Sequence, residues 1–287
     1  MAKALRPDAG ALVALLPGGR VHLQHGPIDI VAQAFGQAEA VRAAYARAAA
    51  RFATVLDELV AELPLLRVEG AALSGGIARR MAAAVAPFRP GFVTPMAAVA
   101  GAVADTIVAA LAGPGITRAY ANNGGDIAVW LAPGQALTCA LAAAAGGLDR
   151  VQLRAEDAVR GIATSGWRGR SFSLGVADAV TVLARTAAMA DAAATMIANA
   201  VDLAGHPGIL RRPARQLQAD SDLGQRLVTV AVPHLDAAEV RLALQAGLRV
   251  AETCQARGLI EGAALFLQGD RVATGAHALP ARENEHV

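Results

Sequence analysis

The sequence predicts an α+β fold in which β-sheets pack against long, alanine-rich helices. Apolar residues recur at three- and four-residue steps over residues 39–63, which indicates a long amphipathic helix. Short runs with β-strand character follow one another between residues 117 and 184. Hydrophobic residues make up 55% of the 287 residues but aromatic residues only 3%, so the core must consist mainly of Ala, Val and Leu.

The strands are recognised by short apolar runs between glycine, proline and polar turn residues. A hairpin is expected around His25-Gly26-Pro27, and another around Gly269-Asp270 near the end of the chain. The full set of expected strands is 20–24, 28–34, 118–121, 127–131, 136–143, 150–155, 171–176, 180–184, 226–232, 263–268 and 271–274.

The helices are recognised by their periodicity and by the residues that start and stop them. Pro64 ends the helix over 39–63, and Asp236 with Glu239 forms a capping box for a helix that Gly258 ends. Further helices are expected at 77–85, 96–112 and 186–203. The helix over 96–112 carries unusually small side chains, which would let another backbone or a ligand come close.

The chain contains no stretch typical of a domain linker and no internal repeat. We therefore expect a single domain over residues 1–287, with 1–15 and 278–287 as flexible ends. The most apolar windows are interrupted by Asp105, by Gly146-Gly147 or by Asp191, so none is long enough to span a membrane. These observations favour a soluble, cytoplasmic protein with no membrane partner, and they leave a homo-oligomer open.

Charge and cysteine content exclude several function classes. The 26 Lys and Arg residues nearly balance the 24 Asp and Glu residues, and the arginines are spread along the chain, which argues against nucleic-acid binding. Cys139 and Cys254 lie in apolar runs without a CxxC spacing, so we expect two buried thiols. Zinc ribbons and thioredoxin-type redox chemistry are thereby excluded.

Asp191 and Thr195 are the first candidates for chemistry. They lie four residues apart in an alanine-rich helix, so both side chains leave from the same helix face. A carboxylate, a hydroxyl and a first-turn carbonyl would supply three hard oxygen ligands for Mg²⁺. The alternative is that both residues cap the helix or bond to neighbouring turns. Asp191 has no Lys or Arg near it in sequence, which favours a metal, a donor cluster or exposure.

The turn Asn122-Asn123-Gly124-Gly125-Asp126 is the second candidate, because its two glycines let backbone amides converge on a phosphate. Its alternative is an ordinary hairpin turn. The third candidate lies in residues 161–171, where Thr164, Ser165 and neighbouring amides could bind phosphate and Arg168 and Arg170 could neutralise it. Its alternative is a polar β-turn with exposed arginines.

Taken in this order, the three segments resemble the ApbE superfamily, whose best-known members are Mg²⁺-dependent FAD:protein FMN transferases. The turn Asn122–Asp126 is similar to the family's glycine-pair turn, and Thr164–Gly166 to its Thr-Ser-Gly segment. Ala190-Asp191 and Thr195 match the family's A-D-x-x-x-T metal pattern. By this resemblance, Asp191, Thr195 and the carbonyl of Ala187 would bind Mg²⁺. The residues it implies for FAD or a related phosphorylated cofactor are Asn122, Asn123, Gly124, Gly125, Asp126, Thr164, Ser165, Gly166 and Arg168.

Two features of the family pattern are missing. Ala100-Gly101-Ala102 stands where the transferases carry Lys-Gly-Tyr, and the histidine-containing loop before residue 178 is absent. The whole chain is more similar to an ApbE-like branch without an assigned activity. It shares with that branch short sequence motifs, among them residues 165–171 and 221–224.

Three functions follow as alternatives. The resemblance implies a Mg²⁺-dependent transferase or hydrolase that acts on a flavin or nucleotide pyrophosphate, with a protein acceptor in the transferase case. The missing Lys-Gly-Tyr and histidine loop favour instead a non-catalytic binder of a flavin, a pterin or another phosphorylated cofactor. A structural or assembly role with a vestigial site is the third hypothesis. The sequence does not identify the catalytic residues.

Overall fold

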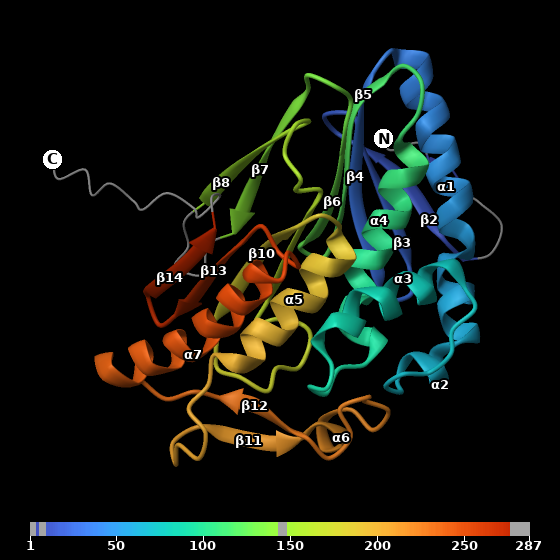
Figure 1. Ribbon diagram of the computed structural model, residues 1–287. Coiled ribbons are helices and arrows are strands. Elements are labelled where there is room, and N and C mark those ends of the chain that lie inside the picture. Colours follow the sequence, from blue (N-terminus) through green and yellow to red (C-terminus); the bar gives the residue numbers. More distant parts are fainter. Residues whose placement is uncertain (1–3, 6–9, 143–147, 276–287) are drawn as a thin grey trace, which may run out of the picture.

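A ten-stranded antiparallel sheet forms the centre of the computed structural model, which describes residues 4–5, 10–142 and 148–275 (Figure 1). In spatial order its strands are β1 (Ala4–Leu5), β2 (Leu12–Leu16), β3 (Arg20–His25), β4 (Ile28–Gly36), β5 (Ile116–Asn123), β6 (Asp126–Leu131), β9 (Gly161–Ser165), β10 (Ala179–Ala184), β13 (Gly262–Leu267) and β14 (Asp270–Gly275). Two separate ribbons pair β7 (Ala136–Ala142) with β8 (Leu148–Arg154) and β11 (Leu210–Pro213) with β12 (Leu227–Ala231). The predicted α+β class is confirmed.

The longer helices pack on one face of the sheet, and the β7–β8 ribbon packs on the other (Figure 1). The helices are α1 (Ala38–Ala61), α2 (Leu63–Leu66), α3 (Gly76–Val85), α4 (Val99–Leu111), α5 (Ala187–Ala200), α6 (Ala214–Leu217) and α7 (Ala237–Ala256), with short 3₁₀ turns at Ala86–Phe88 and Pro95–Ala98. The helix-side core contains many alanines, as the composition predicts.

The predicted long helices are confirmed, and their periodicity explains how they pack. Helix α1 buries Ala44, Tyr45, Ala48, Phe52, Val55 and Leu59, which are spaced by one to four residues along one face. Helix α7 begins at Asp236 with the expected capping box, in which the Asp236 carboxylate accepts from the Glu239 amide at 2.9 Å. None of the helices that the structure describes has the length and apolarity needed to cross a bilayer.

The structure corrects two expectations. Residues 171–176 form a loop rather than a strand, because their amides bond to the end of α5. The Leu174 amide donates to the Asn199 side chain at 2.8 Å, and the Val176 amide to the Val201 carbonyl at 2.8 Å. Residues 161–165, for which a polar β-turn is the alternative expectation, form strand β9.

The expected flexible end over residues 1–15 overlaps strand β2 (Leu12–Leu16), which pairs with β3. The short strand β1 also lies in that segment. The other expected flexible end, 278–287, lies outside the described residues.

Candidate functional site

Helices α4 and α5 lie antiparallel, and each supplies the carboxylate that caps the other. The Asp105 carboxylate on α4 accepts hydrogen bonds from the first two amides of α5, those of Ala187 and Ala188, both at 3.0 Å. The Asp191 carboxylate on α5 accepts from the Gly101 amide, in the first turn of α4, at 3.0 Å. Both carboxylates therefore satisfy amides that a helix N-terminus leaves unpaired.

Glycine residues let the two helices approach closely enough to form these reciprocal caps. A Cβ atom on Gly101 would lie only 2.2 Å from the carbonyl oxygen of Ala187, so only glycine fits where the two helices touch. Gly161 of strand β9 has the same role on the other side of α5, because a Cβ there would lie 2.2 Å from the Ala187 amide nitrogen. The expected close approach to the small-residue helix is confirmed, with α5 as the neighbour.

The two capping carboxylates differ in the charge that faces them. Asp105 is buried and has a cation nearby, with Arg80 Nη1 3.8 Å from its Oδ2. Burial raises the pKa of Asp105, while the Ala188 and Ala187 amides and the Arg80 charge oppose the rise. Burial also raises the pKa of Asp191, but there the nearby charge of a second carboxylate, Asp126, raises that pKa further.

Asp126 begins strand β6 and is 8% exposed. Its Oδ1 accepts a hydrogen bond from the Thr164 amide at 3.3 Å. Burial raises the pKa of Asp126 to about 7, although the Thr164 amide and the charge of Arg170 favour the ionised form. The protein thus keeps two carboxylates, Asp126 and Asp191, within range of one another's charge in a poorly solvated site.

The Asn122–Asp126 turn is a tight hairpin in which Asn123 pairs with Asp126. The Asn122 side-chain oxygen accepts from the Gly125 amide at 2.8 Å, so in this conformation that amide is already bonded within the turn. Gly124 has a φ of 66°, and the guanidinium of Arg170 lies against it, because a Cβ there would be 1.7 Å from Arg170 Nη2. The turn therefore presents a cation beside Asp126.

The Thr164–Gly166 segment is the end of strand β9 and the start of the following loop. The Thr164 hydroxyl lies 2.9 Å from the Thr181 hydroxyl on β10. Gly166 packs against the backbone of Asp178, where a Cβ would be 2.5 Å from the carbonyl oxygen. Arg168, expected to neutralise a phosphate, instead forms a 2.7 Å ion pair with the Asp178 carboxylate.

The predicted metal residues lie on α5. Asp191 and Thr195 are half-buried and one turn apart, and the Thr195 hydroxyl makes no hydrogen bond to another residue within the described ranges. Ala187 lies one turn before Asp191 and is buried against Gly101. No group of three His, Cys, Asp or Glu side chains in the described part of the chain could hold a metal on its own. Hydroxyl, backbone or ligand oxygens would have to complete a coordination shell.

Two of these relationships are not visible in the sequence. The sequence places Asp126 in a phosphate-binding turn, whereas in the structure its carboxylate faces the helices and interacts with Asp191. The sequence predicts that Arg170 neutralises a phosphate together with Arg168, but it gives no sign that the Arg170 charge acts on Asp126. The available signal for Asp126 was alternation along β6, because Ala128 and Trp130 share its face and pack toward the helices.

Comparisons with known proteins identify relatives. The family model described as AbpE bacteria matches residues 13–273. A UPF0280 protein of Methanothrix thermoacetophila is 38% identical over 128 residues, which are 44% of this chain and 52% of that protein. A UPF0280 protein of Methanosphaerula palustris is 41% identical over 137 residues, 46% of this chain and 54% of that protein. The chain thus spans about half the length of these relatives.

Two solved structures also resemble the chain. The apo form of the Pseudomonas stutzeri flavinyl transferase ApbE is 15% identical, covers 95% of this chain and 94% of its own, and gives a TM-score of 0.40. The flavin transferase ApbE from Vibrio cholerae is 12% identical, covers 96% and 97%, and gives a TM-score of 0.35. The predicted resemblance to an ApbE-like branch is confirmed by the family match. Because that match extends over most of the chain, this chain belongs to the family described as AbpE bacteria.

Proposed function

We propose that Asp126 and Asp191 together bind a divalent cation, which holds the phosphates of a flavin or nucleotide while the pyrophosphate bond is cleaved and the released group passes to an acceptor or to water. The observation that carries this proposal is the carboxylate pair itself. Two acids in a poorly solvated site repel each other when both are ionised, unless a cation lies between them or a proton is retained.

Comparison with Asp105 supports a cation at the pair. Asp105 and Asp191 have the same capping role, but Asp105 is balanced by Arg80. Asp191 has no ion pair with any cationic residue in the described ranges. A pure helix cap would need no second acid beside it. Asp126 is therefore the feature that a capping role for Asp191 leaves unexplained.

The available oxygen atoms suit Mg²⁺. Mg²⁺ in proteins is typically bound by one or two carboxylates, with water and substrate phosphate completing its octahedron. Asp126 and Asp191 would supply the carboxylates, and the unbonded Thr195 hydroxyl and the Ala187 carbonyl are the further predicted oxygens. When bound, the ion would polarise phosphate oxygens as a Lewis acid.

The chain's own residues would then orient the phosphate. Arg170 is exposed and lies over Gly124 beside Asp126, where its guanidinium can form paired hydrogen bonds to phosphate oxygens. Thr164 is also exposed, at the end of β9, and its amide is bonded to Asp126. Arg168 would act indirectly, by fixing the loop after β9 through its ion pair with Asp178.

A non-catalytic binder is the second candidate, and Ala100 and Ala102 favour it. The resemblance places Lys and Tyr of the transferases at these positions, so the chain lacks two side chains that contact the flavin there. A binder would keep the cation and the phosphate contacts but release no product. Only the transferase function requires a protein acceptor.

Titration calorimetry with Mg²⁺ and Mn²⁺ tests the cation site. We expect binding by the wild-type protein, loss of that binding in Asp126→Asn and Asp191→Asn, and retention in Asp105→Asn as the matched control. Absence of binding by the wild type would end the proposal. Equal loss in all three variants would indicate a general disturbance of the α4–α5 pair.

Incubation with FAD and Mg²⁺ then separates the two functions. Release of FMN and AMP, detected by chromatography and abolished in Asp191→Asn, would establish catalysis. A stable FAD complex without products would establish binding and exclude hydrolysis of FAD.

A further inference from the structure

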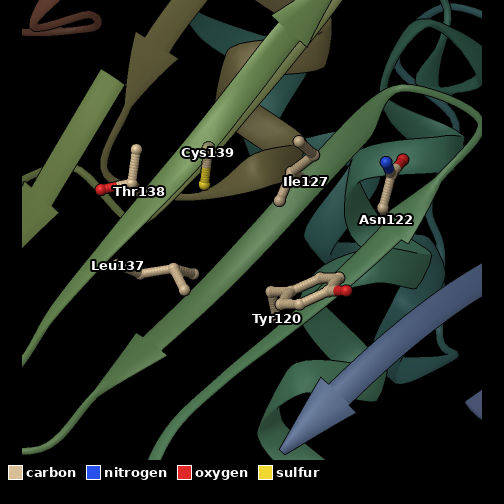
Figure 2. Close-up of a pocket in the computed structure, with 6 residues that line it drawn as sticks. All are labelled: Tyr120, Asn122, Ile127, Leu137, Thr138 and Cys139. Carbon is tan, nitrogen blue, oxygen red and sulfur yellow. The ribbon is translucent and has the colours of Figure 1, made fainter. Parts of the chain in front are cut away.

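A hollow of about 230 Å³ lies on the opposite face of the sheet from the carboxylate pair, between the β5–β6 hairpin and β7. Figure 2 shows Leu137 of β7 lying across from the ring of Tyr120 on β5, with the side chains of Ile127 and Cys139 nearby. Asn122 and Thr138 complete its lining. The hollow therefore combines apolar walls with an aromatic ring and polar groups at its margin.

Two of those polar groups retain unused hydrogen-bonding capacity. The Asn122 side-chain oxygen is engaged by the Gly125 amide, while its amide nitrogen donates to no residue among those described. The Tyr120 hydroxyl lies 3.5 Å from Gln33 Oε1, which is at the limit of a hydrogen bond. A ligand with acceptor atoms at its edge would satisfy these groups.

The hollow and the proposed phosphate site meet at the same hairpin. Asn122 pairs with Ile127 in the hollow, and the next pair, Asn123 with Asp126, faces the helices. Consecutive residues of a strand point to opposite faces, so one step along the hairpin leads from the hollow to the carboxylates. Arg170 lies over the turn that joins them, at Gly124.

We propose that this hollow binds the planar heterocyclic ring of a phosphorylated ligand whose phosphate reaches Arg170 and the turn. This inference rests on the proposed function for the phosphate end. The volume decides how much of the ligand enters: ligand pockets usually measure about 300–1,000 Å³, so a 230 Å³ hollow takes one ring system and leaves the remainder outside. The Tyr120 ring and the side chains of Ile127 and Leu137 contact the ring faces, and Asn122 donates to an acceptor at its edge.

Leu137→Trp tests the hollow by filling it. Leu15→Trp is the matched control, because Leu15 is 41% exposed on β2 and does not line the hollow. The probes are AMP and FMN, observed by saturation-transfer NMR and titrated in the presence of Mg²⁺. We expect Leu137→Trp to weaken the binding of at least one probe tenfold or more, and Leu15→Trp to leave it unchanged.

A second variant protects the test against a folding defect. Asn122→Asp keeps an oxygen for the Gly125 amide but removes the side-chain donor, and we expect it also to weaken the probe that Leu137→Trp affects. Saturation transfer should be stronger to ring protons than to ribose or ribityl protons. Unchanged affinity in Leu137→Trp, or no binding of either probe to the wild type, would overturn the inference.

The Mg²⁺ titration distinguishes this failure from failure of the proposed function. If Leu137→Trp binds Mg²⁺ as the wild type does but loses AMP or FMN, both proposals stand. If the wild type binds Mg²⁺ and Leu137→Trp loses neither probe, only the ring site fails. If the wild type binds a probe that Leu137→Trp loses, but binds no Mg²⁺, the ring site stands and the cation site fails.

Discussion

Asn123 and Asp191 bind opposite sides of one peptide group at the start of α4. The Asn123 side-chain amide donates to the Ala100 carbonyl at 3.1 Å, and the Gly101 amide donates to Asp191 Oδ2 at 3.0 Å. The Ala100 carbonyl and the Gly101 amide belong to the same planar unit, so fixing one fixes the other. Asn123 on β5 thereby orients the donor that holds Asp191 on α5.

This arrangement predicts that Asn123→Ala weakens both stability and cation binding. The buried Ala100–Gly101 peptide would lose a hydrogen bond, which typically costs about 1–3 kcal/mol of unfolding free energy. Loss of an outer-shell partner typically reduces metal affinity about 10- to 100-fold. Urea denaturation and Mn²⁺ titration measure the two effects. Asn122→Ala removes a neighbouring hydrogen bond within the turn and should leave Mn²⁺ affinity near that of the wild type.

The reciprocal caps predict different stability effects for Asp105→Asn and Asp191→Asn. Replacing Asp105 should destabilise the protein by about 2–3 kcal/mol, because two amides of α5 lose a charged acceptor. Asp191→Asn keeps an oxygen that can accept from the Gly101 amide, loses only the charge and removes repulsion with Asp126, so its net cost at pH 8 should be about 1 kcal/mol or less. Urea denaturation in EDTA measures both. A larger cost for Asp191→Asn would contradict the like-charge interpretation.

The raised pKa of Asp126 predicts that this residue makes the metal-free protein less stable as pH rises. Between its ordinary value of 3.8 and about 7, Asp126 holds a proton in the folded protein but not in the unfolded chain. The folded state then binds more protons, so the unfolding free energy contributed by Asp126 falls as pH increases through this window. Asp191 faces Asp126 and has a raised pKa as well, whereas Arg170 and the Thr164 amide oppose the effect.

Asp126→Asn isolates this contribution from other titrating groups. Its stability relative to the wild type should increase by roughly 2–4 kcal/mol from pH 4 to pH 7, since one pKa unit corresponds to about 1.4 kcal/mol. Denaturation at a series of pH values without divalent cations measures the difference. Saturating Mg²⁺ should stabilise the wild type above pH 7 and leave Asp126→Asn unaffected. A difference that does not change with pH would show that Asp126 is ionised normally.

Much of the fold could be predicted from local sequence signals. The helix α1 has a strong three- and four-residue period, and α7 has both its capping box and its terminal glycine, so each was located to within a few residues. The composition of residues 171–176 predicts a strand, but the segment forms a loop. Its amides bond to Asn199 and Val201, which are distant in sequence and visible only in the folded chain.

The candidate site likewise combines features that the local sequence predicts with features that depend on tertiary contacts. Asp191 and Thr195 could be singled out because a carboxylate in an alanine-rich helix is locally conspicuous. The contact of Asp191 with Gly101 joins residues 90 positions apart, and its interaction with Asp126 depends on how β6 packs against the helices. Such relationships follow from tertiary packing, so the sequence indicated individual candidates without their mutual geometry.

Gly101→Ala should disrupt the site through packing alone. The new Cβ would lie 2.2 Å from the Ala187 carbonyl oxygen, and because that oxygen belongs to the backbone, α4 and α5 would have to separate. Overpacking of this kind costs typically 1–3 kcal/mol, and we expect about 3 kcal/mol or more here because both caps would be strained. Thermal unfolding and Mn²⁺ titration should show a loss of stability and of Mn²⁺ affinity, respectively.

The control is Gly76→Ala, in the first turn of α3 with nothing within 4 Å of its Cβ, which should be neutral or stabilising by up to about 1 kcal/mol. Wild-type stability in Gly101→Ala would mean that α4 and α5 do not pack as closely as the reciprocal caps require.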